Sequence, residues 1–281
     1  MHRIGVIGGG TMGAGIAEVA ARAGGDVLVL ERDTDAAYAA RARIARSLTR
    51  AVEAGKLARD IADAAAERIV LTTDIDDLAD RELVIEAAPE IEALKTEFFT
   101  KLDAIVAPEA ILATNTSSIP VIRLAGATAN PGRVVGVHFF NPVPVLPLVE
   151  IVATLKADRA VLDKVTAYAR DVLGKRTIES KDRAGFVVNA LLIPYLCAAV
   201  RMVESGFASV ADIDEGMVAG CVHPMGPLRL ADTIGLDVTL AIAESLYAEF
   251  REPQYVPPLL LRRLVDAGFL GRKTGRGFYT Y

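Results

Sequence analysis

Short apolar runs alternate with stretches of helical composition over the first two thirds of the chain. Strand-like runs rich in branched residues span 3–7, 26–30, 69–72, 83–87, 110–114 and 134–139. Helical composition fills 14–22, 34–55 and 91–106, and two shorter strands at 148–152 and 177–179 flank a helix at about 158–173. This alternation predicts an α/β domain on a parallel, doubly wound sheet of the Rossmann type.

The pattern changes after about residue 182, where strand-like runs cease. Helices are expected at 186–204, 210–219 and 227–250, followed by the proline cluster EPQYVPP and a last helix. The apolar stretch 184–200 is short for a membrane span and is typical of a buried helix. We therefore expect two domains, 1–182 and 183–281, of which the second is all-helical.

A glycine-rich turn joins the first strand to the first helix. Gly8, Gly10 and Gly13 fit GxGxxG, and Glu31 closes the next strand 18 residues after Gly13. The glycines permit a tight turn, the close approach of a pyrophosphate to the helix N-terminus, and close packing of helix on strand. The acid can accept a hydrogen bond from a ribose 2′-hydroxyl, which favours NAD. Arg32 beside it could meet a 2′-phosphate, so NADP stays open.

Composition narrows the class of function. Of the 281 residues, 52% are apolar and 24% are charged, and the net charge of −5 comes without a basic cluster. These values argue against a disordered chain and against a nucleic-acid partner. The two isolated cysteines favour a reducing, cytoplasmic setting, and no His or Cys spacing indicates a metal site. The N-terminus, MHRIGVIGGG, lacks the apolar core of a signal peptide.

Polar clusters follow three of the predicted strands, at EAAPE (86–90), NTSS (115–118) and HFFNP (138–142). Ligands bind at the carboxyl ends of strands in such sheets. A proline-rich turn after His138 could bring Glu150 back beside the imidazole, where a carboxylate would fix the tautomer of a general base for an alcohol. Ser117 lacks a GxSxG elbow and is better suited to hydrogen-bonding a substrate oxygen. His223, which precedes a proline, is interpreted as part of a structural turn.

Arginines recur on one face of the helix expected at 34–55. Arg43, Arg46 and Arg50 stand at i, i+3 and i+7. This spacing is compatible with a site for a phosphate-bearing substrate, although taken alone it favours a solvated basic face.

The order of these motifs resembles that of the short-chain L-3-hydroxyacyl-CoA dehydrogenases, and most of all the bacterial 3-hydroxybutyryl-CoA dehydrogenases. The resemblance rests on the glycine loop, EAAPE, NTSSIP, HFFNPVPVLPLVEI, GFVVNALLIPYL, HPMGPLRLAD and GRKTGRGFY, and it covers essentially the whole chain. It implies NAD-linked interconversion of (S)-3-hydroxyacyl-CoA and 3-oxoacyl-CoA in fatty acid metabolism. It also implies a subunit that dimerises through its helical domain and takes acyl-CoA between its domains.

The resemblance further implies the site residues. The catalytic pair falls on His138 and Glu150, with Ser117 and Asn189 holding the substrate oxygen. Implied cofactor contacts are Gly8, Gly10, Thr11, Met12, Gly13, Glu31, Ala87, Glu90, Lys95, Asn115, Asn141 and Lys273, and implied CoA contacts are Ser47, Arg50 and Lys56. Two positions depart from the family: Ala190 replaces an arginine, and the basic residues near 50–56 are shifted.

Two other functions stay open at this point. A dehydrogenase of a free 3-hydroxy acid on the same fold, of the gulonate or carnitine type, would leave the basic helix face without a ligand. A non-catalytic NAD-binding structural protein is disfavoured because His138, Glu150 and Ser117 are all present. Acyl-chain length and the direction of the reaction in the cell are not determined by these motifs.

Overall fold

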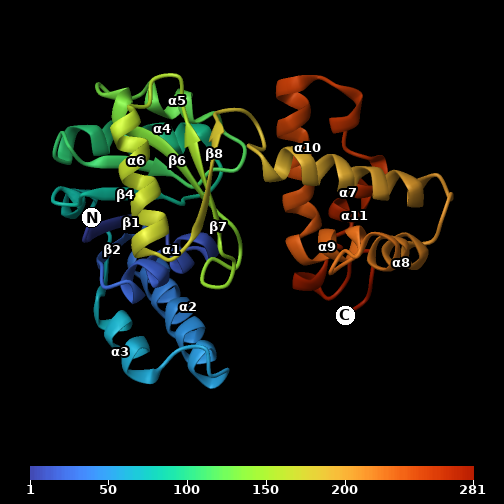
Figure 1. Ribbon diagram of the computed structural model, residues 1–281, viewed down its shortest axis with the longest axis horizontal. Helices are drawn as coiled ribbons and strands as arrows, with labels where there is room; N and C mark the ends of the chain where they lie inside the picture. The colour runs from blue at the N-terminus through green and yellow to red at the C-terminus, as the bar shows by residue number, and fades with distance from the viewer. The chain divides into compact units, whose positions relative to one another are not determined.

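The computed structural model describes residues 1–281 and divides them into two compact units, Met1–Arg183 and Ala184–Tyr281 (Figure 1). All eight strands belong to the first unit, and the second is built from helices. The predicted fold class, a Rossmann-type sheet followed by a helical part, is confirmed. The roles assigned to the two parts, cofactor binding and substrate binding with dimerisation, stay predictions.

One sheet forms the centre of the first unit, in the order β3-β2-β1-β4-β5-β6-β7-β8. Its strands are β1 (Arg3–Ile7), β2 (Asp26–Leu30), β3 (Ile69–Thr72), β4 (Leu83–Glu86), β5 (Ile111–Thr114), β6 (Val134–Phe139), β7 (Leu148–Ala153) and β8 (Arg176–Lys181). The order reverses from β1 to β4, so the carboxyl ends of these two strands form the switch point where such sheets bind ligands.

The sheet departs from the expected parallel arrangement at one place. Strand β7 pairs antiparallel with β6, whereas every other pair is parallel. Only residues 140–147 connect β6 to β7. A parallel return needs a crossover of a dozen or more residues, so this connection can only reverse the chain.

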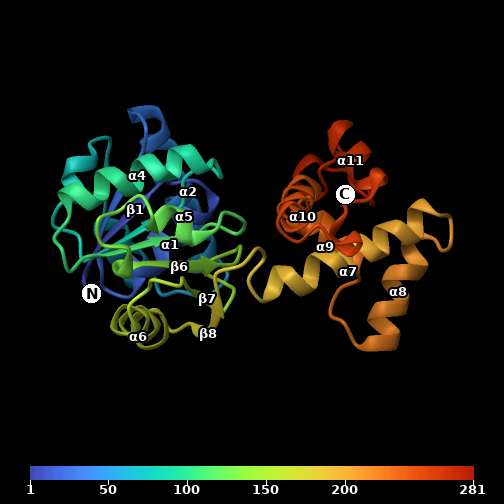
Figure 2. The ribbon, with the colours of Figure 1, turned by 90° about the horizontal axis from the view of Figure 1, so that it is seen from above.

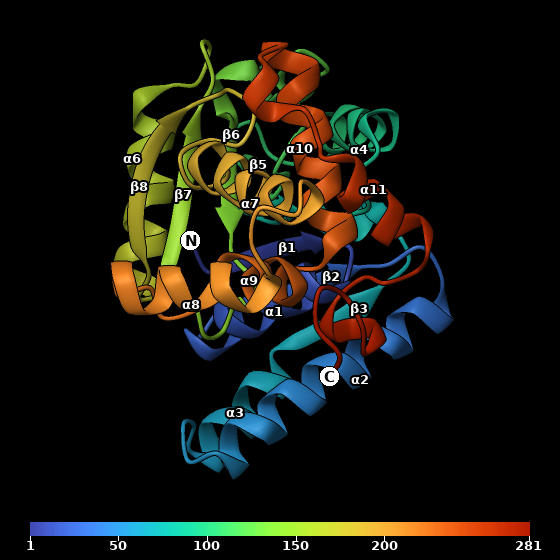
Figure 3. The same cartoon turned by 90° about the vertical axis from the view of Figure 1, so that its right-hand side faces the viewer.

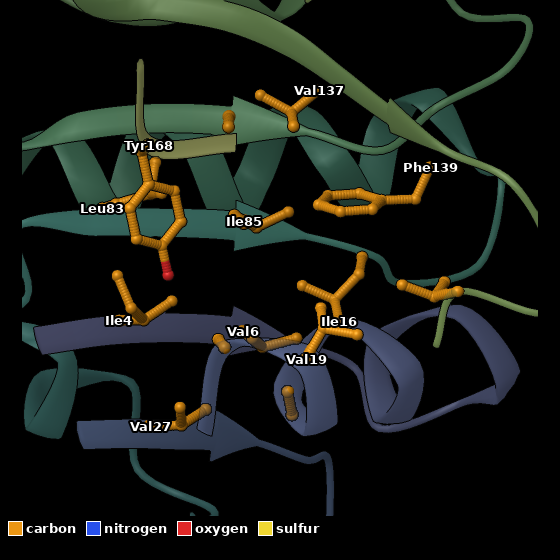
Figure 4. Packing of buried hydrophobic residues seen from close by; sticks show 14 of the residues in the cluster. Ile4, Val6, Ile16, Val19, Val27, Leu83, Ile85, Val137, Phe139 and Tyr168 are labelled. Carbon is orange, nitrogen blue, oxygen red and sulfur yellow. The ribbon is translucent and has the colours of Figure 1, made fainter. Parts of the chain in front are cut away.

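Helices cover both faces of the sheet. They are α1 (Thr11–Arg22), α2 (Thr34–Glu53), α3 (Arg59–Glu67), α4 (Glu92–Ile105), α5 (Val121–Ala125) and α6 (Arg159–Ala167), the last continuing as a π-helical turn over Tyr168–Val172. In Figure 2, α4 and α6 lie on opposite sides of the sheet. The core beneath α1 contains Ile16 and Val19 packed with Val6, Ile85 and Phe139 of the strands (Figure 4).

The sequence missed α3 and merged two helices of the second unit. Helix α3 is a short amphipathic element with Ala62 and Ala65 as its buried residues. The segment expected as one helix at 227–250 is two, α9 (Pro227–Ile234) and α10 (Leu236–Phe250). Gly235 separates them with a φ of 108°, a conformation outside the helical region that glycine adopts readily.

The second unit also contains α7 (Val188–Glu204), α8 (Val210–Cys221) and α11 (Leu259–Asp266), drawn in gold to red in Figure 3. Its C-terminal tail is held by a buried carboxylate: Asp232 accepts hydrogen bonds from the backbone N–H groups of Phe278 and Tyr279, both at 2.9 Å. No helix of the structure has the length and hydrophobicity that crossing a membrane requires.

Candidate active site

His138 and Glu150 face each other across β6 and β7. The antiparallel register pairs the two residues directly, and the imidazole Nδ1 lies 2.8 Å from Glu150 Oε2. The histidine is 5% exposed and the glutamate 0%. Phe140 packs edge-on against the imidazole, with ring centroids 4.6 Å apart. A buried carboxylate on Nδ1 favours the tautomer with its proton there and directs Nε2 toward proton exchange. The structure thus brings together the pair that the sequence predicts.

A cavity of about 1110 Å³ lies at the glycine loop. Among its lining residues are Gly8, Gly10, Thr11, Met12, Glu31 and Ala87, all predicted cofactor contacts. A Cβ on Gly10 would have no atom within 4 Å, so the backbone there is open to a ligand. Gly10 also precedes α1, whose first N–H groups receive no side-chain cap. An uncapped helix N-terminus beside a large cavity fits the pyrophosphate of a dinucleotide.

Glu31 and Arg43 both bind Gly9 of the glycine loop. Glu31 Oε1 accepts a hydrogen bond from the N–H of Gly9 at 2.6 Å, and Arg43 Nη1 donates to the carbonyl oxygen of Gly9 at 2.5 Å. The sequence spacing places Arg43 in one group with Arg46 and Arg50, but in the structure Arg43 has a different environment from the other two. Arg43 is half-buried against the loop, while the other two are exposed.

Gly13 has no room for a side chain. A Cβ at this position would lie 1.7 Å from the carbonyl oxygen of Gly8. Overpacking of this kind costs about 1–3 kcal/mol, so Gly13→Ala should raise the Kd for NADH by about 10- to 100-fold. Fluorescence titration measures this Kd. The matched control is Gly216→Ala, on exposed helix α8 with no neighbour near its Cβ position; an unchanged Kd for Gly13→Ala would contradict the prediction.

Lys95, another predicted cofactor contact, is buried beside the end of β4. Its side chain is 1% exposed, and Nζ lies 2.6 Å from Glu86 Oε1 and 3.1 Å from Glu90 Oε2. Lys95 belongs to the buried face of α4, and its Nζ also donates to the carbonyl oxygen of Ala88, a residue that lines the cavity, at 3.3 Å. Its role as a cofactor contact stays a prediction.

Glu90 gathers the donors of the loop after β5. Its Oε1 accepts the N–H of Ser117 and of Ser118, each at 3.2 Å, and also the hydroxyl of Thr116. Burial tends to raise the pKa of Glu90, but Lys95 and the hydroxyl donors outweigh it, so the pKa lies below its usual value. A carboxylate that stays charged in this position fixes the backbone that presents Ser117.

Two asparagines lie at the neighbouring strand ends. Asn115 directly follows β5, and its Oδ1 accepts the N–H of Phe139 at 2.9 Å, which ties β5 to the strand that carries His138. Asn141 is exposed in the connection between β6 and β7. Both therefore belong to the same edge of the sheet as the histidine.

The remaining predicted residues lie on α7, near the C-terminus, and on or just after α2. Asn189 lies in the first turn of α7 with 8% exposure, and Lys273 forms an exposed ion pair with Asp237 at 2.6 Å. Ser47 is half-buried on α2, whereas Arg50, near the end of that helix, and Lys56, beyond it, are exposed. Their assigned roles stay predictions.

Glu86 and Arg43 stood out in the sequence, within EAAPE and on the basic helix face, but their contacts in the site were not predicted. Glu86 is fully buried between Lys95 and the hydroxyl of Thr114, which donates to Glu86 Oε2 at 2.7 Å. The sequence signal for this contact was an acid at the end of an otherwise apolar strand, because a buried carboxylate requires hydrogen-bonding or charged partners. The contact of Arg43 with Gly9 had no sequence signal, since it joins residues 34 positions apart.

The chain matches two domains of one family along almost its whole length. Residues 3–183 match the 3-hydroxyacyl-CoA dehydrogenase NAD-binding domain, and residues 185–281 match the C-terminal domain of the same family. A 3-hydroxybutyryl-CoA dehydrogenase of Mycobacterium tuberculosis is 56% identical over 282 residues, covering 100% of this chain and 99% of the relative.

Solved structures give the same result. The crystal structure of FadB2 from M. tuberculosis has a TM-score of 0.99 and 56% identity, and covers 100% of this chain and 99% of its own. (S)-3-hydroxybutyryl-CoA dehydrogenase PaaH1 from Ralstonia eutropha has a TM-score of 0.94 and 44% identity, with coverage of 100% and 99%. With its glycine-loop cavity and paired histidine and glutamate, the chain belongs to the 3-hydroxyacyl-CoA dehydrogenase family.

Proposed function

We propose that this enzyme interconverts (S)-3-hydroxybutyryl-CoA and acetoacetyl-CoA with NAD as its cofactor. The observation that carries the proposal is the buried contact of His138 Nδ1 with Glu150 Oε2, at 2.8 Å. The relatives at 56% and 44% identity are named for this substrate, which supports the short acyl chain.

His138 is the proposed general acid and base. In the oxidative direction its Nε2 takes the proton of the 3-hydroxyl, while a bound nicotinamide supplies the acceptor for the hydride that leaves C3. Glu150 then stabilises the imidazolium through Nδ1, and its burial strengthens this interaction because the local dielectric is low. In the reductive direction the imidazolium returns the proton to the oxygen at C3.

Ser117 and Asn189 are the proposed contacts of the oxygen at C3. The backbone of Ser117 is fixed by Glu90, which supports a defined position for its hydroxyl. Preorganised donors of this kind stabilise the charge that develops on the oxygen. Ser47, Arg50 and Lys56 are the proposed contacts of the CoA nucleotide.

The glycine loop and Glu31 are the proposed holders of the dinucleotide. Gly8, Gly10 and Thr11 line the cavity at the start of α1, and Glu31 lies in its wall beside Arg32. Glu31 would accept the 2′-hydroxyl of the adenosine ribose and would repel a 2′-phosphate, which favours NAD over NADP.

Glu31→Ala should shift the cofactor preference toward NADPH. It removes the negative charge and leaves Arg32 and Arg43 in the cavity wall. We expect the ratio of kcat/KM for NADPH to that for NADH to rise by about 10- to 100-fold, which corresponds to about 1.4–2.8 kcal/mol. Steady-state kinetics with both cofactors measure this ratio. The control is Asp35→Asn, which removes an exposed acid in the first turn of α2. If the NADPH-to-NADH ratio of kcat/KM were the same in both variants, Glu31 would not be the residue that selects NADH.

We also propose a homodimer in the cytoplasm. Light scattering after size exclusion tests the assembly. The helical unit exposes Phe207 by 77% and Leu191 by 73%, which supports association through this unit.

The proposed function is tested by following NADH oxidation at 340 nm with a series of 3-oxoacyl-CoA substrates, from acetoacetyl-CoA to longer chains. The highest kcat/KM is expected with acetoacetyl-CoA. Turnover confined to free 3-hydroxy acids would favour the gulonate- or carnitine-type alternative, and silence with every substrate despite NADH binding would favour a non-catalytic protein.

A further inference from the structure

Lys175 is a buried lysine directly before β8 that the mechanism above does not use. Its side chain is 8% exposed, and its Nζ donates to the carbonyl oxygens of Val143 at 2.6 Å and Leu146 at 2.8 Å. Burial, aided by nearby Arg22, lowers the pKa of Lys175, and Glu18 opposes this shift. A lysine held in a buried position by two backbone carbonyls is a specific anchor for the segment that carries them.

The anchored segment is the connection 140–147 between β6 and β7. It begins two residues after His138 and ends three residues before Glu150. It also contains Asn141, a proposed cofactor contact. Arg176, the residue after Lys175, adds a backbone hydrogen bond to the carbonyl of Pro147 at 2.7 Å. The start of β8 therefore holds this connection at three carbonyl oxygens.

Val143 of the connection packs against α1. Val143 is 2% exposed, and a Cβ on Gly15 of α1 would lie 2.8 Å from the Cβ of Val143. Val143 thus occupies the space that a side chain at position 15 would need. Segment 140–147 is therefore held both by the packing of Val143 on α1 and by the ammonium of Lys175.

We propose that Lys175 is a positioning residue for the hydride-transfer reaction, acting by fixing segment 140–147 and with it His138 and Asn141. The inference rests on the proposed function. Without the ammonium, the carbonyls of Val143 and Leu146 lose their donor in a buried setting, and the segment must shift to regain one. A displacement of about 1 Å at the reacting groups can cost about 100-fold in rate.

Lys175→Met keeps the length of the side chain and removes its donors. We expect kcat with acetoacetyl-CoA to fall by about 10- to 100-fold, with a smaller change in the Kd for NADH. The primary isotope effect with C4-deuterated NADH should rise, because hydride transfer becomes slower than the other steps. Lys175→Arg should recover part of kcat, since it keeps a donor. The control is Lys164→Met, which removes an exposed lysine from α6.

A merely structural lysine would change the melting temperature while leaving kcat and the isotope effect of the folded enzyme unchanged, and that result would overturn the inference. Should Lys175→Met fail to fold, Gly15→Ala decides, because its Cβ would push on Val143 and shift the same segment, while alanine is the better helix former. A reduced kcat with a raised isotope effect supports the inference, and wild-type values overturn it. Turnover by the wild-type enzyme tests the proposed function separately.

Discussion

Replacing His138 by glutamine should lower kcat for acetoacetyl-CoA reduction by about 10²–10⁴-fold, the usual contribution of general acid–base catalysis. Glutamine retains hydrogen-bonding atoms near Glu150 but cannot exchange a proton at neutral pH. The Kd for NADH should stay close to that of the wild type, because His138 is not among the residues lining the glycine-loop cavity. Stopped-flow turnover and fluorescence titration measure the two quantities.

The second internal histidine provides the control for this experiment. His223 lies in the helical unit, where its Nδ1 is 3.2 Å from the hydroxyl of Tyr195. His223→Gln should leave kcat near the wild-type value. Glu150→Gln should give an intermediate loss, because the amide keeps a contact with Nδ1 but no longer stabilises the imidazolium by charge. Near-normal turnover in His138→Gln would remove the histidine from the mechanism.

Lys95→Met should have the largest effect on stability. It would leave Glu86, which is 0% exposed, without its cationic partner at 2.6 Å. Breaking a buried ion pair from one side costs about 3–5 kcal/mol. For a chain of this size that corresponds to a fall in Tm on the order of 10 °C. Differential scanning calorimetry measures the change.

Two variants make this prediction specific. Lys101→Met on the same helix removes a lysine that is 54% exposed and paired only with the exposed Glu97, so it should hardly change Tm. The double variant Glu86→Gln/Lys95→Met removes both charges and should recover part of the lost stability. A Tm for Lys95→Met equal to that of Lys101→Met would show that the buried pair contributes nothing.

Local sequence pattern determined much of this protein. The spacing of Gly8, Gly10 and Gly13 predicted the cofactor loop, because a tight turn, an open backbone and close packing each require a residue without a Cβ. Strand-like runs predicted all eight strands. Central strands such as β6 are continuously hydrophobic because both of their faces are buried, whereas β8 is polar and partly exposed and was predicted only over 177–179. The boundary between helix α9 and α10 was missed, although Gly235 stood there as a breaker.

Only the tertiary structure determined which side chains far apart in the chain contact one another. The turn predicted between His138 and Glu150 became a directly opposed pair through the antiparallel register of β6 and β7. Lys95 pairs with two carboxylates, and Lys175 donates to two carbonyls some 30 positions away. Periodicity and backbone conformation are local properties that a sequence records directly. The partner of a buried charge depends instead on which oxygens the folded sheet brings within hydrogen-bond reach.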